Sequence, residues 1–494
     1  MAVMDELLRD EEGEPAAGAV DTAGTVEPGT MLNVAGTGEE APEKQGGGGE
    51  GDGGKATTVR LGRPTGAAAD GAGTFFFCDN NRVRKVTPDG TITTLAGLGT
   101  GEQMVPRGQE AKKFNLVCPA AVAQGPDGSL YVADWKDDRV NKIAADGTVW
   151  PVAGNGQRAK EQRGKAEGDG RKATEAPLRW PTDLAMDRAG NLFIAEDVRV
   201  RRVAPDGTID TVAGNGTETP AKDGSRATLS GFTGIQGIAV NAAGDLYIAE
   251  TKTHRVLKVS RGVLTIVAGT GKGGFNGDGG KAVEATLWRP LVLAFDQYGN
   301  LYIGEVQNQR VRRVTPDGRI STVAGNGTEG GKGDGGPATG AQLGIVTGLT
   351  VDHNGNLFIV DSLTHRVRMV VQAARPPRKI RTVRTLSGFD RLNNQHAKPG
   401  EPFGQPLQVE ARDTNGEFVP GARIRFEVDA GTGSTFAAQK PGRTAEADTN
   451  DDGLATAPEL LAGPTPGQAT VTITAPGHKG HAPTRYTAHV DPLD

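Results

Sequence analysis

A short phrase that ends in Val-Ala-Gly or Leu-Ala-Gly returns along most of this chain. It reads "MLNVAG" at residues 31–36, and related phrases end at residues 97, 154, 214, 269 and 325. A second segment, such as "LYIGEV" at 301–306, recurs six times, about every 55 to 62 residues. A unit of that length cannot bury its apolar residues alone. The units are therefore predicted to pack against one another, in a stack or in a ring, and to form one domain.

Each unit is interpreted as four short β-strands. In the best copy, which starts at Leu287, the strands read "LVLAFD", "LYIGE", "RVRRV" and "ISTVAG". The segments between them, "DQYGN" and "TPDGR", hold the Gly, Asn and Asp residues that favour tight hairpins. Four antiparallel strands per unit, repeated radially, predict an all-β fold with a β-propeller.

The two ends of the repeat region complement each other. The sixth unit, residues 348–371, has three strand segments and no closing Val-Ala-Gly, whereas residues 31–36 carry that phrase with no strands before it. We expect the first segment to pair with the last and to complete the sixth blade. Such closure removes an open sheet edge, which would otherwise favour aggregation. The predicted domain is a six-bladed propeller over residues 31–371.

The repeated residues resemble those of the NHL-repeat family. The resemblance rests on "LYIAE" (246–250), "RVRRVTPDG" (310–318), "VAGNGT" (323–328) and "GDGGPAT" (333–339), and it covers about residues 31–371. It is strongest to the NHL variant of bacterial proteins and teneurins. Blade two departs, because "GEQMVPRGQEAKKF" (101–114) replaces the "GDGGPAT" loop. Some propellers of this kind are lyases with a histidine-bound metal or lactonases with acid and amide ligands.

Function is expected on the propeller face that carries the second-to-third strand loops and the long connections between blades. Residues that break the repeat there are the most informative. Asp183 and Gln236 stand near the start of inner strands, where other blades carry small or different residues. Trp135 lies in a second-to-third loop, and Trp180 and Trp288 directly precede inner strands. These five are candidate ligand-binding residues, although packing of the tryptophans under loops is the alternative.

Every second strand ends with an acid on that same face. The six acids are Asp79, Asp134, Glu196, Glu250, Glu305 and Asp361. One interpretation is a ring that binds a ligand, with Glu196, Glu250 and Glu305 as candidates. The other is that each acid pairs with backbone or arginine inside its own blade. The repetition favours this second interpretation.

Several motifs for chemistry fail on their context. Gly49 to Lys55 fits a phosphate loop, but Ala56 follows where Ser or Thr is needed, and the phrase belongs to the repeat. None of the seven histidines falls on a predicted inner strand, so no metal is expected in the channel. The two cysteines form no disulfide framework. No cofactor is expected.

The rest of the chain divides into a tail, a linker and a second domain. Residues 1–30 are acidic and are predicted to be disordered, and residues 372–384 are a basic linker with prolines. In residues 385–494, "DTNGEFVPGARIRF", "AEADTNDDGLAT" and "GQATVTITA" resemble the bacterial immunoglobulin-like group 1 domain of invasins and intimins. The resemblance implies a spacer or adhesion module, usually on exported proteins.

One segment of that second domain fits a calcium loop. Asp448, Asn450, Asp452, Gly453 and Glu459 match the EF-hand pattern, but strand-like sequence flanks them where helices are needed. Calcium there is kept as the weaker alternative.

Composition sets limits on partners and location. The net charge is −5, so nothing global indicates nucleic acid, and no apolar run is long enough for a membrane span. No secretory signal is recognised, which makes a cytoplasmic location the default, against the export that the second domain implies. The oligomeric state is left open.

Two functions remain in view. The first is a non-catalytic recognition protein that binds a protein or a glycan on the long-loop face. The second is a propeller enzyme, lactonase-like or lyase-like, with acids in its channel. Changing Asp183 or Gln236 to alanine is expected to cost little stability, since neither side chain belongs to a repeated contact.

Overall fold

The computed structural model describes residues 26–371 apart from 42–50, 71–72, 100–107, 161–162 and 165. Within residues 382–490 it describes all but 386–394, 400, 403–406, 413–422, 430, 432, 437–442, 449–453, 458–459, 463 and 475–483. The chain forms two compact units, residues 1–375 and 376–494.

The first unit contains six antiparallel sheets, here called blades. From the innermost strand outward they are: blade 1, β2 (Pro64–Ala69), β3 (Phe75–Asp79), β4 (Arg82–Val86) and β5 (Ile92–Ala96); blade 2, β7 (Pro119–Gln124), β8 (Leu130–Asp134), β9 (Arg139–Ile143) and β10 (Thr148–Ala153); blade 3, β12 (Asp183–Met186), β13 (Leu192–Glu196), β14 (Arg199–Val203) and β15 (Thr208–Ala213); blade 4, β16 (Ile235–Val240), β17 (Leu246–Glu250), β18 (Arg255–Ser260) and β19 (Val263–Ala268); blade 5, β20 (Pro290–Phe295), β21 (Leu301–Glu305), β22 (Arg310–Val314) and β23 (Ile320–Ala324); blade 6, β24 (Val346–Val351), β25 (Leu357–Asp361), β26 (Arg366–Val370) and β1 (Met31–Ala35).

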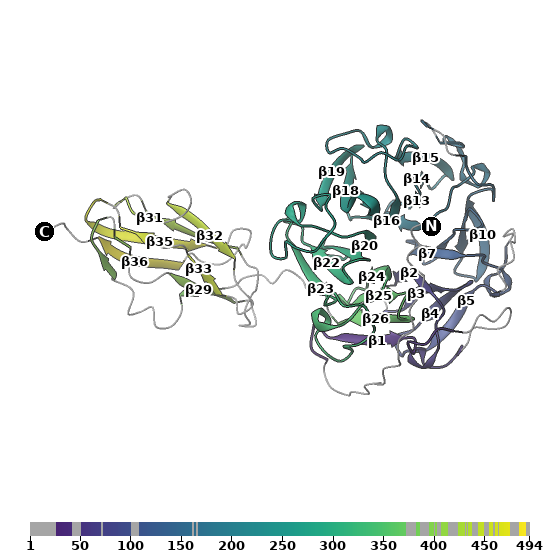
Figure 1. Cartoon of the computed structure of the whole chain (residues 1–494), viewed down its shortest axis with the longest axis horizontal. Coiled ribbons are helices and arrows are strands. Elements are labelled where there is room, and N and C mark those ends of the chain that lie inside the picture. The colour runs from purple at the N-terminus through teal and green to yellow at the C-terminus, as the bar shows by residue number, and fades with distance from the viewer. Residues whose placement is uncertain are drawn as a thin grey trace. The chain divides into compact units, whose positions relative to one another are not determined.

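The blades surround a common centre. Their innermost strands contact one another in a closed ring, from β2 through β7, β12, β16, β20 and β24 back to β2, as Figure 1 shows. Every second strand is buried along its whole length or nearly so, because each blade is packed between two neighbours. The predicted all-β architecture and its six four-stranded units are confirmed.

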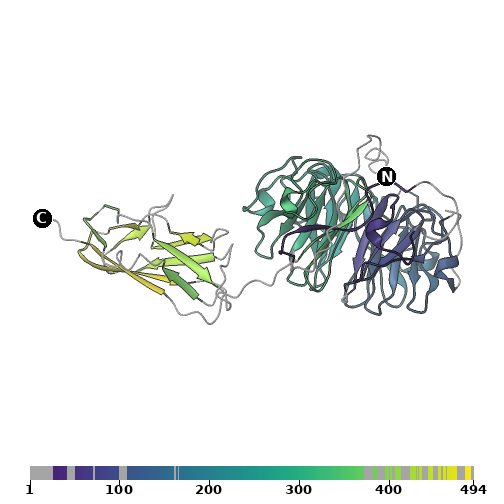
Figure 2. The same ribbon diagram turned by 90° about the horizontal axis from the view of Figure 1, so that it is seen from below.

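The N-terminal strand β1 lies at the outer edge of blade 6, next to β26. Met31 faces Val370 in this pairing, and its side chain is fully buried in the core between blades 5 and 6. On its other side, Met31 donates its N–H to Gly336 O (2.9 Å) and accepts from Gly335 N (2.7 Å). β1 is thus bonded along both edges, and Figures 1 and 2 show it in purple beside the green strands of blade 6.

The bonded chain begins slightly before the expected start of the domain. Gly29 N donates to Val371 O at 2.8 Å, and Val371 N donates to Thr30 O at 2.9 Å. Residues 29 and 30 therefore belong to the propeller rather than to the predicted tail, of which residues 1–25 lie outside the described residues.

The repeated phrases bond to each other between blades. Each connection carries a one-turn 3₁₀ helix that begins with a buried alanine: η1 (Ala56–Thr58), η2 (Ala111–Lys113), η3 (Ala173–Glu175), η4 (Ala227–Leu229), η6 (Ala282–Glu284) and η7 (Ala338–Gly340). Gly36 N, which ends the first phrase, donates to Ala56 O at 3.0 Å. The other five copies make the same bond. Gly36 has φ +88°, and an added Cβ would lie 2.1 Å from His365 O, so only glycine fits there.

Short extra strands cover part of the outer edges. β6 (Gln109–Glu110) pairs with β10, and β11 (Arg171–Lys172) pairs with β15. Single bridges, such as the one between Lys55 and Thr91, play the same part in other blades. A further 3₁₀ turn, η5 (Thr251–Thr253), follows β17.

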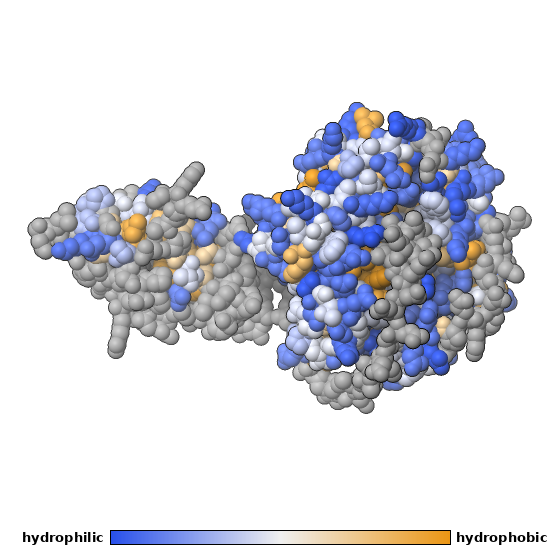
Figure 3. All heavy atoms as spheres, in the orientation of Figure 1, coloured by the Kyte–Doolittle hydropathy of each residue, from blue (hydrophilic) through white to orange (hydrophobic). Residues whose placement is uncertain are grey.

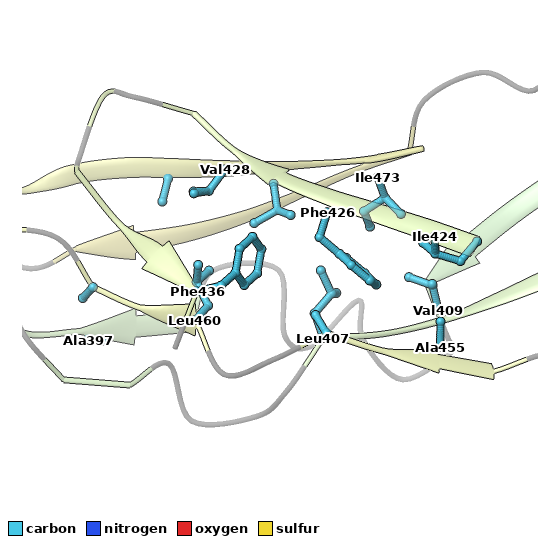
Figure 4. Close-up of a cluster of buried hydrophobic side chains, with 14 of the residues drawn as sticks. Ala397, Leu407, Val409, Ile424, Phe426, Val428, Phe436, Ala455, Leu460 and Ile473 are labelled. Atoms are coloured by element: carbon cyan, nitrogen blue, oxygen red, sulfur yellow. The ribbon is translucent and has the colours of Figure 1, made fainter. Parts of the chain in front are cut away.

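The second unit contains a three-stranded sheet and a five-stranded sheet. The first has the order β27 (Thr382–Thr385), β29 (Gln408–Arg412) and β33 (Leu454–Thr456); the second has the order β28 (Gln395–Ala397), β36 (Thr484–Val490), β35 (Gly467–Thr474), β30 (Arg423–Val428) and β32 (Thr444–Asp448). β31 (Thr435–Phe436) pairs with β34 (Leu460–Leu461). Val409 and Ala455 from the first sheet share a core with Phe426 and Ile473 from the second (Figure 4).

Two details of this unit bear on the sequence predictions. β27 starts at Thr382, inside the segment expected to be linker, of which residues 372–381 lie outside the described residues. The calcium-loop pattern is flanked by strands, since β32 ends at Asp448 and β33 begins at Leu454. Most of the pattern itself lies outside the described residues. The immunoglobulin-like assignment stays a prediction.

Candidate functional site

The propeller has two different faces because its strands alternate in direction. One face, the hairpin face, carries the short turns between first and second and between third and fourth strands. The other, the long-loop face, carries the second-to-third loops and the connections between blades. The connection from Gly325 to Leu343 is an example, and it contains η7. All the candidate residues stand at strand ends on the long-loop face.

A buried arginine lock stabilises four of the blades. The arginine at the centre of the third strand reaches the aspartate of the preceding connection in the pairs Arg84–Asp52, Arg201–Asp169, Arg312–Asp278 and Arg368–Asp334. Each arginine is at most 1% exposed. Three of them also approach the acid at the end of the second strand, as Arg84 does with Asp79 at 3.2 Å. In the sequence, the two partners of the lock recur as "RVR" on the third strand and "GDGG" in the connection. The sequence analysis did not connect these two recurrences with each other.

Glu196, Glu250 and Glu305 are buried inside their blades. Glu196 accepts from Arg179 N at 3.0 Å, and Glu250 accepts from Arg255 Nη2 at 2.6 Å and from Thr233 N at 3.1 Å.

Glu305 accepts from Asn308 Nδ2 at 2.6 Å. Burial raises the pKa of Glu305 to about 7, although Asn308 and the Arg312 guanidinium favour its charged form. The geometry of these acids favours pairing within the blade over a ligand ring.

Blades 2 and 4 lack the arginine of the lock. Blade 4 has Leu257 in its place, which is fully buried, and its acid Glu250 takes Arg255 as partner instead. Blade 2 has Asn141 there, also fully buried. Its acid Asp134 is held by backbone N–H groups, from Val117 at 2.7 Å and Cys118 at 2.8 Å. Burial raises the pKa of Asp134 to about 6.

Trp135 and Trp180 come together between blades 2 and 3. Their ring centroids are 6.2 Å apart and the planes differ by 18°, so the rings stack. Trp135 is 9% exposed, and Trp180 is half-buried. The guanidinium groups of Arg158 and Arg179 lie 4.8 Å and 4.3 Å from the centre of the Trp180 ring. Sequence reasoning named both tryptophans but not their contact, because the stack joins a loop of one blade to the connection of the next.

Asp138 fixes the Trp180 corner of this stack. Its carboxylate accepts the backbone N–H of Trp180 at 2.9 Å and the Arg158 Nε–H at 3.1 Å. Trp180 has φ +48°, a left-handed conformation that is uncommon for a bulky residue. The bond to Asp138 is one of the contacts that hold it there. The cluster therefore presents one partly exposed indole edge with two guanidinium groups on the long-loop face.

Trp288 stands apart from that pair, at the start of blade 5. It is 42% exposed, and Phe275, in the same connection between blades 4 and 5, is 43% exposed. The next residue, Arg289, donates its N–H to His254 Nδ1 at 3.1 Å. Figure 3 shows a propeller surface that is hydrophilic over most of its visible area, so exposed aromatic side chains are exceptions on it.

Asp183 joins blade 3 to blade 4. Its carboxylate accepts the N–H of Ile238 on β16 at 2.8 Å and that of Leu184 at 2.9 Å. Three of the other blades have glycine at this position, where inner strands approach closely: an added Cβ at Gly237 would lie 2.2 Å from Leu291 O. Burial raises the pKa of Asp183 to about 7. Asp183 thus makes a contact between blades that is not one of the repeated contacts and that the sequence analysis did not foresee.

Gln236 lies on the next inner strand, β16, of blade 4. It is the bulged residue of β16, two positions before Ile238, and is 8% exposed. At the same position in other blades, Thr65 and Thr347 donate to the first carbonyl of the next inner strand. The structure thus places Asp183 and Gln236 on neighbouring inner strands, whereas the tryptophans lie outside the inner strands.

Clusters of the commonest metal-binding side chains are absent from the described residues. No three histidine, cysteine, aspartate or glutamate side chains there come close enough to hold an ion. No helix within the described part of the chain is long and apolar enough to cross a membrane.

Comparisons with known proteins agree with the propeller. Residues 25–107 and 145–224 match the teneurin NHL domain, and residues 232–259 match the NHL repeat. Teneurin-m of Drosophila melanogaster is 26% identical over 353 residues, which are 65% of this chain and 12% of that protein. Teneurin-4 of Homo sapiens is 27% identical over 332 residues, 60% of this chain and 12% of that protein. The match thus spans a small part of these relatives' length.

A solved structure supports the fold alone. A structural genomics protein of unknown function from Bacteroides thetaiotaomicron superposes with a TM-score of 0.50 at 16% identity, over 69% of this chain and 75% of that one.

Proposed function

We propose that this NHL-repeat propeller is a non-catalytic recognition protein that binds a protein or a glycan on its long-loop face. The repeated acids Glu196, Glu250 and Glu305 are engaged inside the blades, which leaves the residues that break the repeat as the distinctive surface. The second unit serves in this proposal as an immunoglobulin-like spacer or second contact. Such a domain favours a place outside the cell for the whole protein.

The partly exposed Trp180 between two arginines is the observation that carries the proposal. An indole with guanidinium groups over its ring offers apolar area and hydrogen-bond donors at one spot, the combination that dominates many interfaces. Trp288 adds a second exposed indole on the same face. Neither ring is needed to complete a repeated contact of the blades.

A matched set of tryptophan variants tests the proposal. A ligand is first found with the full chain, by pull-down and on a glycan array. The full chain with Trp180→Ala or Trp288→Ala is then titrated, and at least one is expected to bind about tenfold more weakly or worse. Trp150→Ala is the control, because Trp150 is 50% exposed but lies on β10 at the outer edge of blade 2. If Trp150→Ala weakens binding and the other two do not, function was assigned to the wrong surface.

One observation favours the alternative of a propeller enzyme. Asp183 is a half-buried carboxyl on an inner strand whose pKa is raised to about 7, a value suited to proton transfer near neutral pH. Lactone hydrolysis by the full chain, lost in Asp183→Asn at unchanged melting temperature, would establish the enzyme. Absence of activity over a panel of lactones and cyclic esters would leave recognition as the function.

A further inference from the structure

Blade 2 contains a buried amide at the position where its neighbours, blades 1 and 3, have a buried arginine. Asn141 is fully buried, and neither its Oδ1 nor its Nδ2 has a hydrogen-bond partner within the described residues. Asn115 is 5% exposed, and its Oδ1 also has no partner there. A buried amide without partners is costly, so it calls for a group that the protein chain does not itself provide.

These atoms lie where other blades place a guanidinium. Asn141 occupies the third-strand position of Arg84, Arg312 and Arg368, opposite Val132 on β8. Asn115 follows the η2 alanine by four residues, as Gln342 follows the η7 alanine, and Gln342 O accepts from Arg368 Nη1. The contact in blade 6 is made by the backbone carbonyl of Gln342. The register of the repeat therefore brings the Asn141 side chain and the residue Asn115 to the position of the missing cation.

Asp134 completes the set. It stands two residues after Val132 on β8, hence on the same side of the sheet as Asn141. It is 1% exposed, and the arginine that follows it, Arg139, is directed to Asp137 at 2.6 Å. Asp134 accepts hydrogen bonds from the backbone N–H groups of Val117 and Cys118. A buried carboxylate without a cation beside it is unfavourable.

Blade 4 shows that polar atoms are not required at this position. There Leu257 fills the space with an apolar side chain, and Arg255 turns to the acid Glu250 at 2.6 Å. Blade 2 keeps an amide where an apolar residue would pack, and directs its arginine away from the acid. Both differences are accounted for if blade 2 takes its cation from solution.

We infer that blade 2 binds a hard metal cation between Asp134, Asn141 and Asn115, at the position that a guanidinium occupies in blades 1, 3, 5 and 6. One carboxylate and two amide oxygens are ligands that calcium and alkali cations accept, with water completing the shell. The Nδ2 of Asn141 then faces such a water. The cation would hold η2 to the sheet of blade 2, as the arginine lock does elsewhere.

The test uses the chelator-treated full chain with terbium and calcium as probes. Terbium emission excited through tryptophan is expected, because Trp135 is adjacent to Asp134, and calcium should displace it. Asn141→Ala and Asn115→Ala should each weaken calcium binding at least about tenfold. Asn300→Ala is the control, since Asn300 is a buried amide that binds Asp296 in a hairpin of blade 5. Terbium emission that persists in both site variants comes from another site, such as the calcium-loop pattern of the second unit.

Melting temperatures distinguish a monovalent from a divalent cation in the site. The melting temperature is compared in KCl or NaCl and in choline chloride at equal ionic strength. If KCl or NaCl stabilises the wild type but not Asn141→Ala, the bound cation is monovalent and the proposed site is supported. Asn141→Arg should fold and lose the response to every cation.

Two results would overturn the inference. The first is that Asn115→Ala and Asn141→Ala respond to every cation as the wild type does, both in terbium or calcium binding and in melting temperature. Water would then occupy the site. The second is that Arg107→Ala, which alters a segment outside the described residues, creates a cation response absent from the wild type. That would mean that a side chain of the protein, Arg107, supplies the positive charge in the wild type.

Discussion

Blade 6 and blade 2 reach the same four-stranded shape by opposite means. Blade 6 is discontinuous in sequence, since its outer strand β1 comes from the other end of the propeller, but it carries the full arginine lock through Arg368 and Asp334. Blade 2 is continuous, but Asn141 replaces the arginine. A blade of this fold can therefore be discontinuous in sequence and keep the arginine lock, or be continuous and lack it. Substitutions in the two blades should lower stability for different reasons.

Removing β1 should have the largest effect. A full chain that lacks residues 1–36 loses Met31 from the core and leaves β26 with an open edge, whereas loss of residues 1–28 removes none of the bonds of β1. We expect the longer deletion to aggregate or to lose more than about 5 kcal/mol of unfolding free energy. The shorter one should be nearly neutral. Equal melting temperatures for the two proteins would contradict closure by β1.

Breaking the lock in blade 6 should come next. Arg368→Ala leaves Asp334 without its cation and removes a buried guanidinium from blade 6, and we expect a loss of about 3–5 kcal/mol in denaturant unfolding. Asn141→Ala, measured without added cations, should change stability by less than about 1 kcal/mol, because it removes unpartnered atoms. A larger loss from the Asn141 change would show that the amide has partners in blade 2.

The seam between blades 3 and 4 should respond to pH. The pKa of Asp183 is raised to about 7 in the folded state, against about 4 in an unfolded chain. The folded state therefore binds the proton more tightly, and the wild type loses stability relative to Asp183→Asn as pH rises from 5 to 8. Denaturant unfolding of both proteins at several pH values measures this. A stability difference that does not change with pH would show that Asp183 ionises normally.

Changes on the hairpin face should have the smallest effect. Asp206 lies in an exposed turn, where it accepts the N–H of Thr208 at 2.9 Å. Asp206→Tyr should cost no more than about 1 kcal/mol and leave ligand affinity unchanged. Loss of binding in this variant, with Trp180→Ala binding normally, would reverse the assignment of the two faces.

The repeat allowed most of the propeller to be predicted. Strand segments, hairpin turns and the pairing of residues 31–36 with the last blade all follow from local pattern and from the missing fourth strand. The contacts between segments did not follow from pattern. The Trp135–Trp180 stack and the bond from Asp183 to Ile238 both cross a blade boundary, and the register between neighbouring blades is set by packing. The Arg–Asp lock was visible only as two separate recurrences.

The position of β1 also bears on how the protein is made. Met31 leaves the ribosome before the other strands of the propeller, but its partner Val370 follows only after about 340 more residues, which takes on the order of tens of seconds at ordinary rates of synthesis. During that interval the nascent ring has two unpaired edges, one at each end of the growing array. The first propeller strand to be translated is therefore the last to pair. Synthesis of β26, rather than the folding of any one earlier blade, is then the event that allows the ring to close.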